Sequence, residues 1–261
     1  PTTSGAEERL SPLGDALRRA LDGPYHPIRA RARVDLLPED LLRDPAMPME
    51  QAREWTTTKL IELAGRGYGR SGFPKEYGGT ADVPGTIVGF EMLAHGDLSL
   101  TVKSGVHFGL FGGAVTNLGT QWHHETFLPD IISLRLPGCY AMTEEGHGSD
   151  VQSLETTITY LPDTDELEIH SPTPSATKSY IGNAARDARM AVVFGQLVVG
   201  GESHGIHAVL VPIRDEAGST LPGVTIGDHG AKGGLAGVDN GTLRFDHVRV
   251  PRRMLLDRYG G

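Results

Sequence analysis

The feature that most constrains the fold is a change in the spacing of apolar residues near Pro137-Gly138. Before this point apolar residues recur at helical spacing, as in the segment 50–64, and after it they alternate with polar residues, as in 156–160. The first spacing is typical of helices with one buried face, and the second is typical of half-buried β-strands. We therefore expect an α+β chain, with an N-terminal α-helical domain at 1–135 and a small antiparallel β-sandwich or barrel domain at 136–255.

Proline, aspartate and glycine mark the expected helices of the first half. Pro84 is expected in the first turn of a helix that runs to about His95. Asp97 is expected to cap the next helix, which ends at Gly119. Four glycines inside that helix predict close packing of a neighbouring helix, with a ligand tail as the alternative. The candidate core residues of the segment 50–64 are Trp55, Leu60, Ile61 and Leu63.

Turn signals divide the second half into seven or eight short strands. Asn240-Gly241 predicts a hairpin before a strand that begins at Thr242. The glycine-rich segment 65–79 resembles a dinucleotide loop, but no expected strand precedes it, so we interpret it as a connector.

Charge and cysteine content exclude several classes of protein. The chain has 261 residues and a net charge of −9, which argues against broad binding of nucleic acid or anionic membranes. Its single cysteine, Cys139, allows no disulfide framework and is expected to be a buried packing residue. No apolar run reaches the length of a membrane-spanning helix. Without a signal-peptide core or a C-terminal targeting tripeptide, we expect a cytoplasmic protein, or a peroxisomal one in a eukaryote.

The segment Tyr140–Asp150, at the boundary between the two halves, is rich in residues that could contact a ligand. It contains two glycines, three hydroxyl side chains, two adjacent carboxylates and one imidazole. Glycine allows a backbone to approach a ligand closely, and hydroxyl and N–H groups can bind the polar edge of a planar cofactor or an anion. An ordinary turn is the alternative. Adjacent carboxylates point to opposite sides of an extended backbone, so we expect Glu144 to anchor the loop and Glu145 to face solvent.

Other motifs give no catalytic or metal site. His123 and His124 are adjacent, so on a helix they point in different directions, and no metal site is expected there. The sequence has no Gly-x-Ser-x-Gly nucleophile elbow and no Walker loop.

The pattern Ala-Met-Thr-Glu-x-x-x-Gly-Ser-Asp-x-x-Ser, from Ala141 to Ser153, resembles the signature of the acyl-CoA dehydrogenase and acyl-CoA oxidase superfamily. Gly146-His147-Gly148 is similar to the oxidase branch, because the dehydrogenases usually carry a small residue in place of His147. Segments 72–79, 106–109, 207–214, 221–228 and 239–241 resemble the same family in order and spacing.

This resemblance implies an FAD site. Its expected residues are Tyr140, Met142, Thr143, Gly148, Ser149, Tyr180, Ile181 and Gly182. Tyr140, Met142 and Thr143 match positions that touch the isoalloxazine ring, with Thr143 donating to the pyrimidine side. Ser149 matches a position near the flavin phosphates or the acyl-CoA. Gly182 takes the place of an oxidase glycine near the reactive edge of the flavin, where dehydrogenases commonly have threonine.

The resemblance also implies an α,β-desaturation of an acyl-CoA thioester, with O₂ as the electron acceptor and H₂O₂ as a product. The family's catalytic glutamate lies in a helical domain that follows the β-domain. Residues 256–261 are expected to begin the connection to that domain, so no catalytic base is expected within this chain. We expect a fragment or one half of a two-chain enzyme, with a homodimer partner or a complementary C-terminal chain.

Two other functions remain open from the sequence. An acyl-CoA dehydrogenase would pass its electrons to an electron-transfer protein, but His147 and Gly182 are unfavourable to it. A non-catalytic binding or assembly module could keep the fold and lose the reaction.

Overall fold

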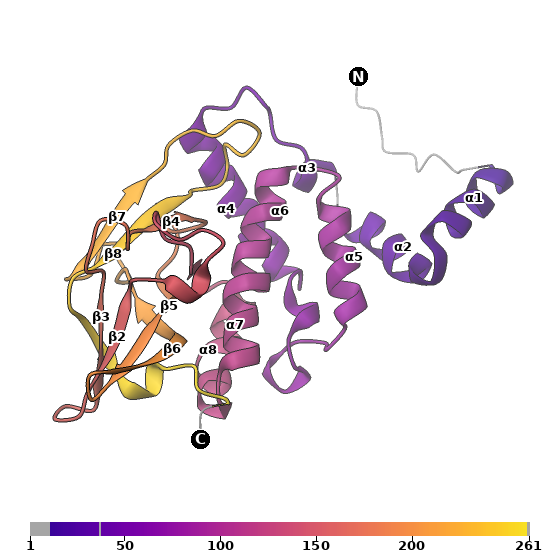
Figure 1. Ribbon diagram of the computed structural model, residues 1–261. Helices are drawn as coiled ribbons and strands as arrows, with labels where there is room; N and C mark the ends of the chain where they lie inside the picture. The colour runs from indigo at the N-terminus through magenta and orange to yellow at the C-terminus, as the bar shows by residue number, and fades with distance from the viewer. Residues whose placement is uncertain (1–10, 37, 260–261) are drawn as a thin grey trace.

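The computed structural model describes residues 11–36 and 38–259. The first part of the chain is helical and the second part is a β-domain that packs against it (Figure 1). The helices are α1 (Pro12–Asp22), α2 (His26–Asp35), α3 (Pro38–Leu41), α4 (Met49–Gly65), α5 (Val83–Leu93), α6 (Leu98–Ser104), the π-helical segment η4 (Gly105–Phe111), α7 (Gly112–Leu118) and α8 (Gln121–Ile132). The predicted fold class, a helical domain followed by a β-domain, is confirmed.

The expected caps position the helices of the first half. Asp97 accepts a hydrogen bond from the Leu100 N–H at 2.8 Å, so α6 begins where the sequence predicts. The helix then continues through η4 and α7 to Gly119, where the backbone becomes extended. Its glycines permit close packing at specific points: a Cβ on Gly112 would lie 2.7 Å from the ring of Phe73.

Two details of the helical half differ from the sequence analysis. Ile61 was expected in the core, but its side chain is 51% exposed, whereas Leu60 and Leu63 are buried. The helix α2 was not predicted, because it has no apolar stripe and carries arginines on much of its surface. Its residues Arg29 and Arg33 instead bind acidic groups of α1 and α5.

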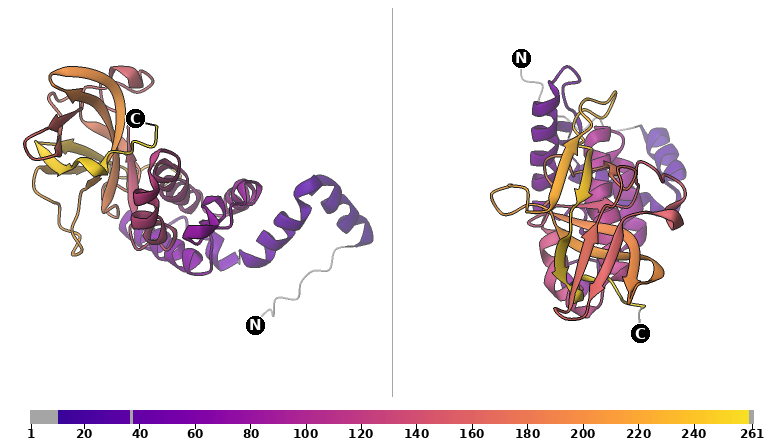
Figure 2. Two further views of the ribbon diagram at one scale, coloured as in Figure 1. Left: turned by 90° about the horizontal axis from the view of Figure 1, so that it is seen from below. Right: turned by 60° about the vertical axis from the view of Figure 1, so that its left-hand side comes forward.

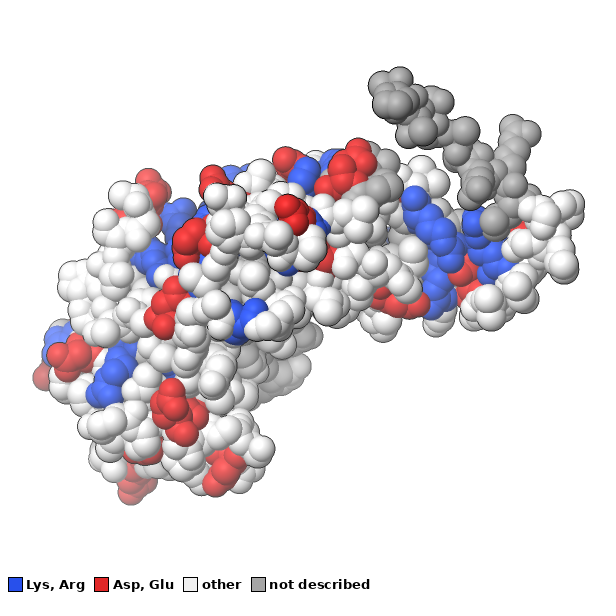
Figure 3. Space-filling model, turned by 90° about the horizontal axis from the view of Figure 1, so that it is seen from above, with Lys and Arg blue, Asp and Glu red and all other residues white. Residues whose placement is uncertain are grey.

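Helices α1 and α2 extend away from the rest of the molecule (Figure 2). Blue and red side chains lie next to each other over this end (Figure 3). Arg33 pairs with Asp22 at 2.6 Å, Arg31 with Asp35 at 3.1 Å, and Arg29 with Glu91. A hollow of about 350 Å³ lies between these helices and α5. The arginines and carboxylates that line this hollow pair with one another, so its described lining carries both signs of charge.

The β-domain contains two sheets. Its strands are β1 (Gly138–Ala141), β2 (Thr157–Leu161), β3 (Glu166–His170), β4 (Lys178–Ile181), β5 (Met190–Val199), β6 (Glu202–Pro212), β7 (Val224–Asp228), β8 (Gly241–Phe245) and β9 (Val248–Pro251). One sheet has six strands, with the order β1-β5-β2-β3-β9 and β6 paired to β5, and the other has the order β4-β8-β7. The described residues thus form nine strands, rather than the expected seven or eight.

The larger sheet is mixed rather than antiparallel throughout, as was expected. Strand β1 runs parallel to the first half of β5, and β2 runs parallel to its second half. Parallel strands cannot be joined by a tight turn, so turn signals in the sequence could not reveal these pairs. All other pairs are antiparallel.

Strands β7 and β8 do form an antiparallel hairpin, but Asn240-Gly241 is not its tight turn. A loop of residues 229–240 connects β7 to β8, and the Asn240 amide donates to the Tyr180 carbonyl at 2.9 Å. The chain passes between the two sheets at Asp246-His247, where His247 has φ 52°. Asparagine therefore serves a tertiary contact here instead of a turn.

A single apolar core joins the two halves. Phe111 of η4 packs so closely on β1 that a Cβ on Gly138 would lie 2.2 Å from its ring. Cys139 beside it is fully buried, as expected, and burial raises the pKa of its thiol. Within the described residues, no helix is long and apolar enough to cross a bilayer.

Candidate functional site

A pocket of about 380 Å³ lies where the helix α6–η4 meets the ends of β1 and β4. One wall is apolar and the other carries hydroxyl, amide and glycine residues. Its lining residues are Val102, Val106, Leu110, Tyr140, Met142, Thr143, Tyr180, Ile181, Gly182 and Asn240. None of them is charged, so the pocket suits an uncharged ring with a polar edge.

Most of the residues predicted to contact FAD meet at this pocket. Six of the eight line it, namely Tyr140, Met142, Thr143, Tyr180, Ile181 and Gly182. They come from two segments about forty residues apart in the sequence, which the fold brings together. Gly148 and Ser149 lie on the exposed loop after β1 and do not line the pocket.

The apolar wall comes from one face of a helix. Val102, Val106 and Leu110 follow one another at intervals of four residues. A Cβ on Gly182 would lie 2.8 Å from Cγ2 of Val106, which is closer than side chains tolerate. Glycine at 182 therefore allows the strand segment to approach this helix. The spacing of the three apolar residues is the signal that could have identified this wall from the sequence.

Tyr180 is held in an uncommon backbone conformation at the mouth of the pocket. Its φ is 55°, and its ring stacks on His229 with a centroid separation of 4.3 Å and an interplanar angle of 5°. The Tyr180 N–H donates to Nε2 of His229 at 3.1 Å, and its carbonyl accepts from Asn240. The loop 229–240 thus fixes the position of Tyr180. The sequence analysis did not identify His229.

Glu144 anchors the loop after β1, as expected. Its oxygens accept from the N–H groups of Glu155 and Thr156, at 2.7 and 3.0 Å. Lys178 donates to Glu144 at 2.9 Å, and both side chains are fully buried. Burial lowers the pKa of Lys178 to about 8, and the Glu144 carboxylate opposes that shift. Glu144 therefore stabilises the loop after β1, and its side chain does not line the pocket.

Glu145 and His147 also bind neighbouring loops. Glu145 is exposed, as expected, and accepts from the Ser179 hydroxyl at 2.6 Å. Nε2 of His147 lies 3.4 Å from a Glu155 oxygen. Hydrogen bonds from Ser175 and Thr173, and a smaller one from His147, lower the pKa of Glu155. Glu145 and His147 lie outside the pocket lining.

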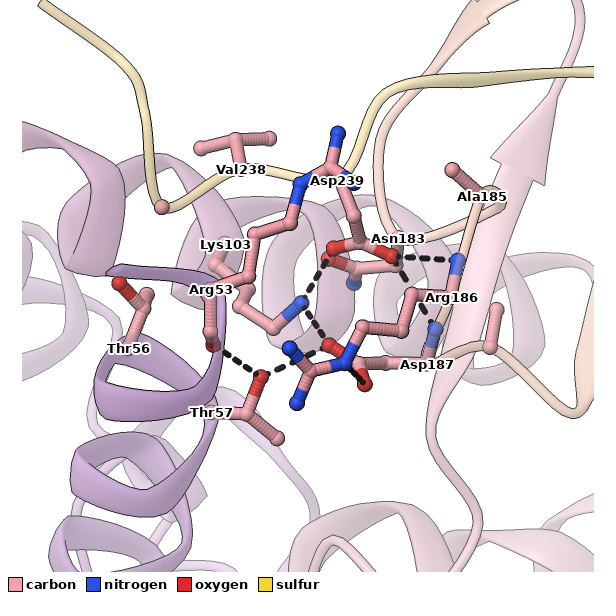
Figure 4. Close-up of polar contacts among 12 residues, drawn as sticks. Arg53, Thr56, Thr57, Lys103, Asn183, Ala185, Arg186, Asp187, Val238 and Asp239 are labelled. Carbon is pink, nitrogen blue, oxygen red and sulfur yellow. Dashed lines mark hydrogen bonds and ion pairs between the residues drawn. The ribbon is translucent and has the colours of Figure 1, made fainter. Parts of the chain in front are cut away.

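A buried cluster of charges joins the helical half to the loops around the pocket (Figure 4). Nζ of Lys103 lies 2.6 Å from Asp187 and 2.5 Å from Asp239. The second oxygen of Asp239 accepts from the N–H groups of Arg186 and Asp187. Because Asp239 precedes Asn240, this cluster fixes the loop that contacts Tyr180. The sequence analysis did not identify Lys103, since lysine inside an apolar helix gives no pattern of its own.

His123 and His124 make separate structural contacts. Nδ1 of His123 accepts from the Thr120 N–H at 3.1 Å and completes the N-terminal cap of α8. Nε2 of His124 contacts the Thr116 carbonyl at 3.0 Å. The two rings point to different partners, as their adjacency on a helix requires.

Two family models match this chain and together span most of it. Residues 30–135 match the acyl-CoA dehydrogenase N-terminal domain, and residues 139–248 match the acyl-CoA dehydrogenase middle domain. The chain belongs to the acyl-CoA dehydrogenase family, of which it carries these two domains.

Its curated relatives include acyl-CoA oxidases. The chain is 43% identical over 209 residues to peroxisomal acyl-coenzyme A oxidase 3 of Arabidopsis thaliana, covering 80% of this chain and 31% of that protein. It is 39% identical over 274 aligned residues to peroxisomal acyl-coenzyme A oxidase 2 of the same plant, covering 99% of this chain and 38% of that protein. The chain therefore spans about a third of the length of these relatives.

Solved structures with the same fold are also acyl-CoA oxidases. Acyl-CoA oxidase 3 of Yarrowia lipolytica is 33% identical, with a TM-score of 0.79 over 91% of this chain and 34% of that one. Acyl-CoA oxidase 2 of Caenorhabditis elegans, solved with FAD, ascaroside-CoA and ATP, is 27% identical, with a TM-score of 0.75 over 94% of this chain and 37% of that one.

Proposed function

We propose that this chain is the flavin-contacting part of an FAD-dependent acyl-CoA oxidase. The observation that carries the proposal is the convergence of two signature segments, 140–143 and 180–182, on one uncharged pocket. The relatives support it because they are named acyl-CoA oxidases. Their names also favour the peroxisome over the cytoplasm as the location of this chain.

The pocket fits the ring system of a flavin in size and chemistry. Its volume of about 380 Å³ lies in the usual range for ligand pockets. Val102, Val106 and Leu110 provide an apolar wall against which a planar ring can pack. Thr143 and Asn240 provide polar groups on the opposite side. Gly148 and Ser149 lie outside the lining, and we assign them to the more distant phosphate or acyl-CoA portion of the ligands.

Bound FAD would supply the two-electron acceptor for α,β-desaturation of an acyl-CoA thioester, with the electrons passing to O₂ to give H₂O₂. The residues of this chain hold and tune the ring. A donor such as the Thr143 hydroxyl at the pyrimidine edge stabilises negative charge there. Tyr140 and Tyr180 would border a bound ring, and Gly182 would leave room at its reactive edge. No carboxylate lines the described pocket, so we assign removal of the α-proton to a glutamate of a complementary C-terminal chain.

Titration with FAD, followed by flavin fluorescence, tests the proposed site. We expect weak binding by the 261-residue chain. Thr143→Val keeps the side-chain shape and removes one hydrogen bond, so the dissociation constant should rise about 2- to 10-fold. Thr159→Val, on the partly exposed strand β2, is the matched control and should bind like the unaltered chain.

Two outcomes would contradict the flavin site. If no FAD binds, even with a complementary C-terminal chain present, the chain is a non-catalytic module. If Thr159→Val weakens binding as much as Thr143→Val, the ring lies elsewhere.

Reoxidation of the reduced flavin distinguishes an oxidase from a dehydrogenase. The reconstituted protein is reduced anaerobically and mixed with air, while flavin absorbance and H₂O₂ are measured. An oxidase should reoxidise rapidly and release H₂O₂ in proportion to its flavin. Slow reoxidation without H₂O₂ would favour a dehydrogenase that uses an electron-transfer protein.

A further inference from the structure

A cluster of two histidines and two carboxylates lies at the crossing between the two sheets, outside the flavin pocket. We propose that it binds a divalent transition metal ion of the zinc type, with His170, Asp246 and His247 as ligands. Histidine nitrogen and carboxylate oxygen are the ligands that such ions accept. The lining of the flavin pocket does not include these three side chains.

The sheet brings the two histidines together. Strands β3 and β9 pair antiparallel, with Ile169 opposite Val248. His170 and His247 are the next residues beyond this pair. Their rings stack with a centroid separation of 4.1 Å and an interplanar angle of 16°. The register therefore fixes the rings side by side without help from a flexible loop.

The three ligand atoms surround one point. Nδ1 of His170 lies 3.8 Å from Oδ1 of Asp246, and Nε2 of His247 lies 3.9 Å from the same oxygen. All three atoms lie within 4.8 Å of one another. These distances are too long for hydrogen bonds. Two atoms bound to a tetrahedral zinc ion at about 2.0 Å lie roughly 3.3 Å apart. Because the nitrogen lone pairs lie in the ring planes, at least one imidazole must turn out of the stack to complete the site.

Hydrogen bonding leaves the histidine nitrogens ready to bind. Nδ1 of His247 lies 3.0 Å from Oε1 of Glu168, and when Nδ1 is the donor Nε2 keeps a free lone pair. This is the carboxylate–histidine–metal arrangement found around zinc ions. Nδ1 of His170 has no hydrogen-bond partner among the described residues. Arg249 contacts the other oxygen of Glu168, at 3.4 Å, and keeps that carboxylate in place.

Nδ1 of His170 is buried, so an ion would approach from the exposed side of the cluster, where Asp246 and His247 lie. The side chain of Asp246 is 83% exposed and that of His247 is 59% exposed. A second group, Glu144, His147 and Glu155, also brings three ligand atoms together. There the Glu144 oxygens already accept from Lys178 and from two backbone N–H groups, so they are not available.

A bound ion would stabilise the connection between β8 of the smaller sheet and β9 of the larger sheet. Asp246 and His247 are the only residues between β8 and β9. Phe245 before them already exchanges hydrogen bonds with Ser171, which follows His170. Metal ligation would join the same two segments through their side chains and stabilise the folded state.

Calorimetric titration with zinc chloride tests the site. The 261-residue chain is prepared without a histidine tag and treated with a chelator, and we expect one site that is lost on substitution. His170→Gln and His247→Asn should each weaken binding at least about tenfold. Asparagine is chosen at 247 because it tolerates the positive φ. Glu168→Gln, which changes no ligand, should weaken binding about 10- to 100-fold.

His147→Gln and His204→Gln are the matched controls, and both should bind zinc like the unaltered chain. His204 is exposed, and His147 belongs to the second group. Absence of zinc binding, unchanged binding in His170→Gln and His247→Asn, or loss of binding in His147→Gln would each overturn the proposal. Cobalt absorption of the unaltered chain adds a test that requires no variant: tetrahedral nitrogen and oxygen ligands should give visible bands, and their absence would contradict the site.

Discussion

Lys103→Met is expected to lower the free energy of unfolding by about 3–5 kcal/mol, the usual cost of removing one partner from a buried ion pair. The Lys103 side chain is almost fully buried, and it contacts both Asp187 and Asp239. Methionine preserves most of the side-chain volume, but it leaves the buried Asp239 without its cation and Asp187 with Arg186 alone. Urea unfolding followed by circular dichroism measures the change.

Lys59→Met on α4 is the matched control for this prediction. Lys59 pairs with Glu62 at 2.8 Å near the surface, and such pairs contribute about 0–1 kcal/mol. Lys103→Met should also weaken FAD binding, because Asp239 supports the loop that holds Tyr180. Equal stability losses in the two variants would show that the Lys103 cluster contributes no more than a surface ion pair.

Acid is expected to destabilise the protein by about 3 kcal/mol between pH 6.5 and 4 through His107 alone. Burial is the main cause that lowers the pKa of this histidine to about 4; the Ile131 carbonyl opposes the shift, and the nearby Lys103 charge adds a smaller lowering effect. In the folded chain Nε2 contacts the Ile131 carbonyl and Nδ1 accepts from the Gly138 N–H, so the neutral ring satisfies both. The unfolded chain protonates at about 6.5, so falling pH favours unfolding until the folded ring also titrates.

The slope of stability against pH measures the His107 effect. In His107→Gln the unfolding free energy should depend less on pH between 6.5 and 4, whatever its absolute value. The exposed His204→Gln should keep the slope of the unaltered chain. Carboxylates titrate in all three proteins, so their contribution to the slope cancels when the slopes are compared. Identical slopes for His107→Gln and the unaltered chain would contradict the assignment.

The spacing of apolar residues was enough to predict the main elements. The change of period near Pro137 separates the helical and β halves, and Asp97 begins its helix as predicted. Long-range pairing was less accessible. The parallel pairing of β1 with β5 joins segments about fifty residues apart, and no local turn signal accompanies it. Helix α2 was missed because ion pairs, rather than an apolar stripe, fix it to its neighbours.

The candidate site was predictable where a motif marks it. The segments containing Thr143 and Gly182 were identified by family resemblance, and the structure brings them to one pocket. Their roles toward FAD stay predictions. His229 and Lys103 were missed because their importance comes from contacts with residues distant in the sequence. Such contacts have no local spacing that could reveal them.

The wide turn of η4 also determines where this helix can change length. Removing one residue from a regular helix rotates everything after it by about 100°. A deletion in α6 would therefore turn Phe111 away from β1. A deletion within η4 instead replaces the i→i+5 hydrogen bonds of a π-helix with the i→i+4 hydrogen bonds of an α-helix. The buried faces of α6 and α7 then keep their orientation relative to their neighbours. We expect single-residue deletions among relatives of this chain to fall in η4 rather than in the helices on either side.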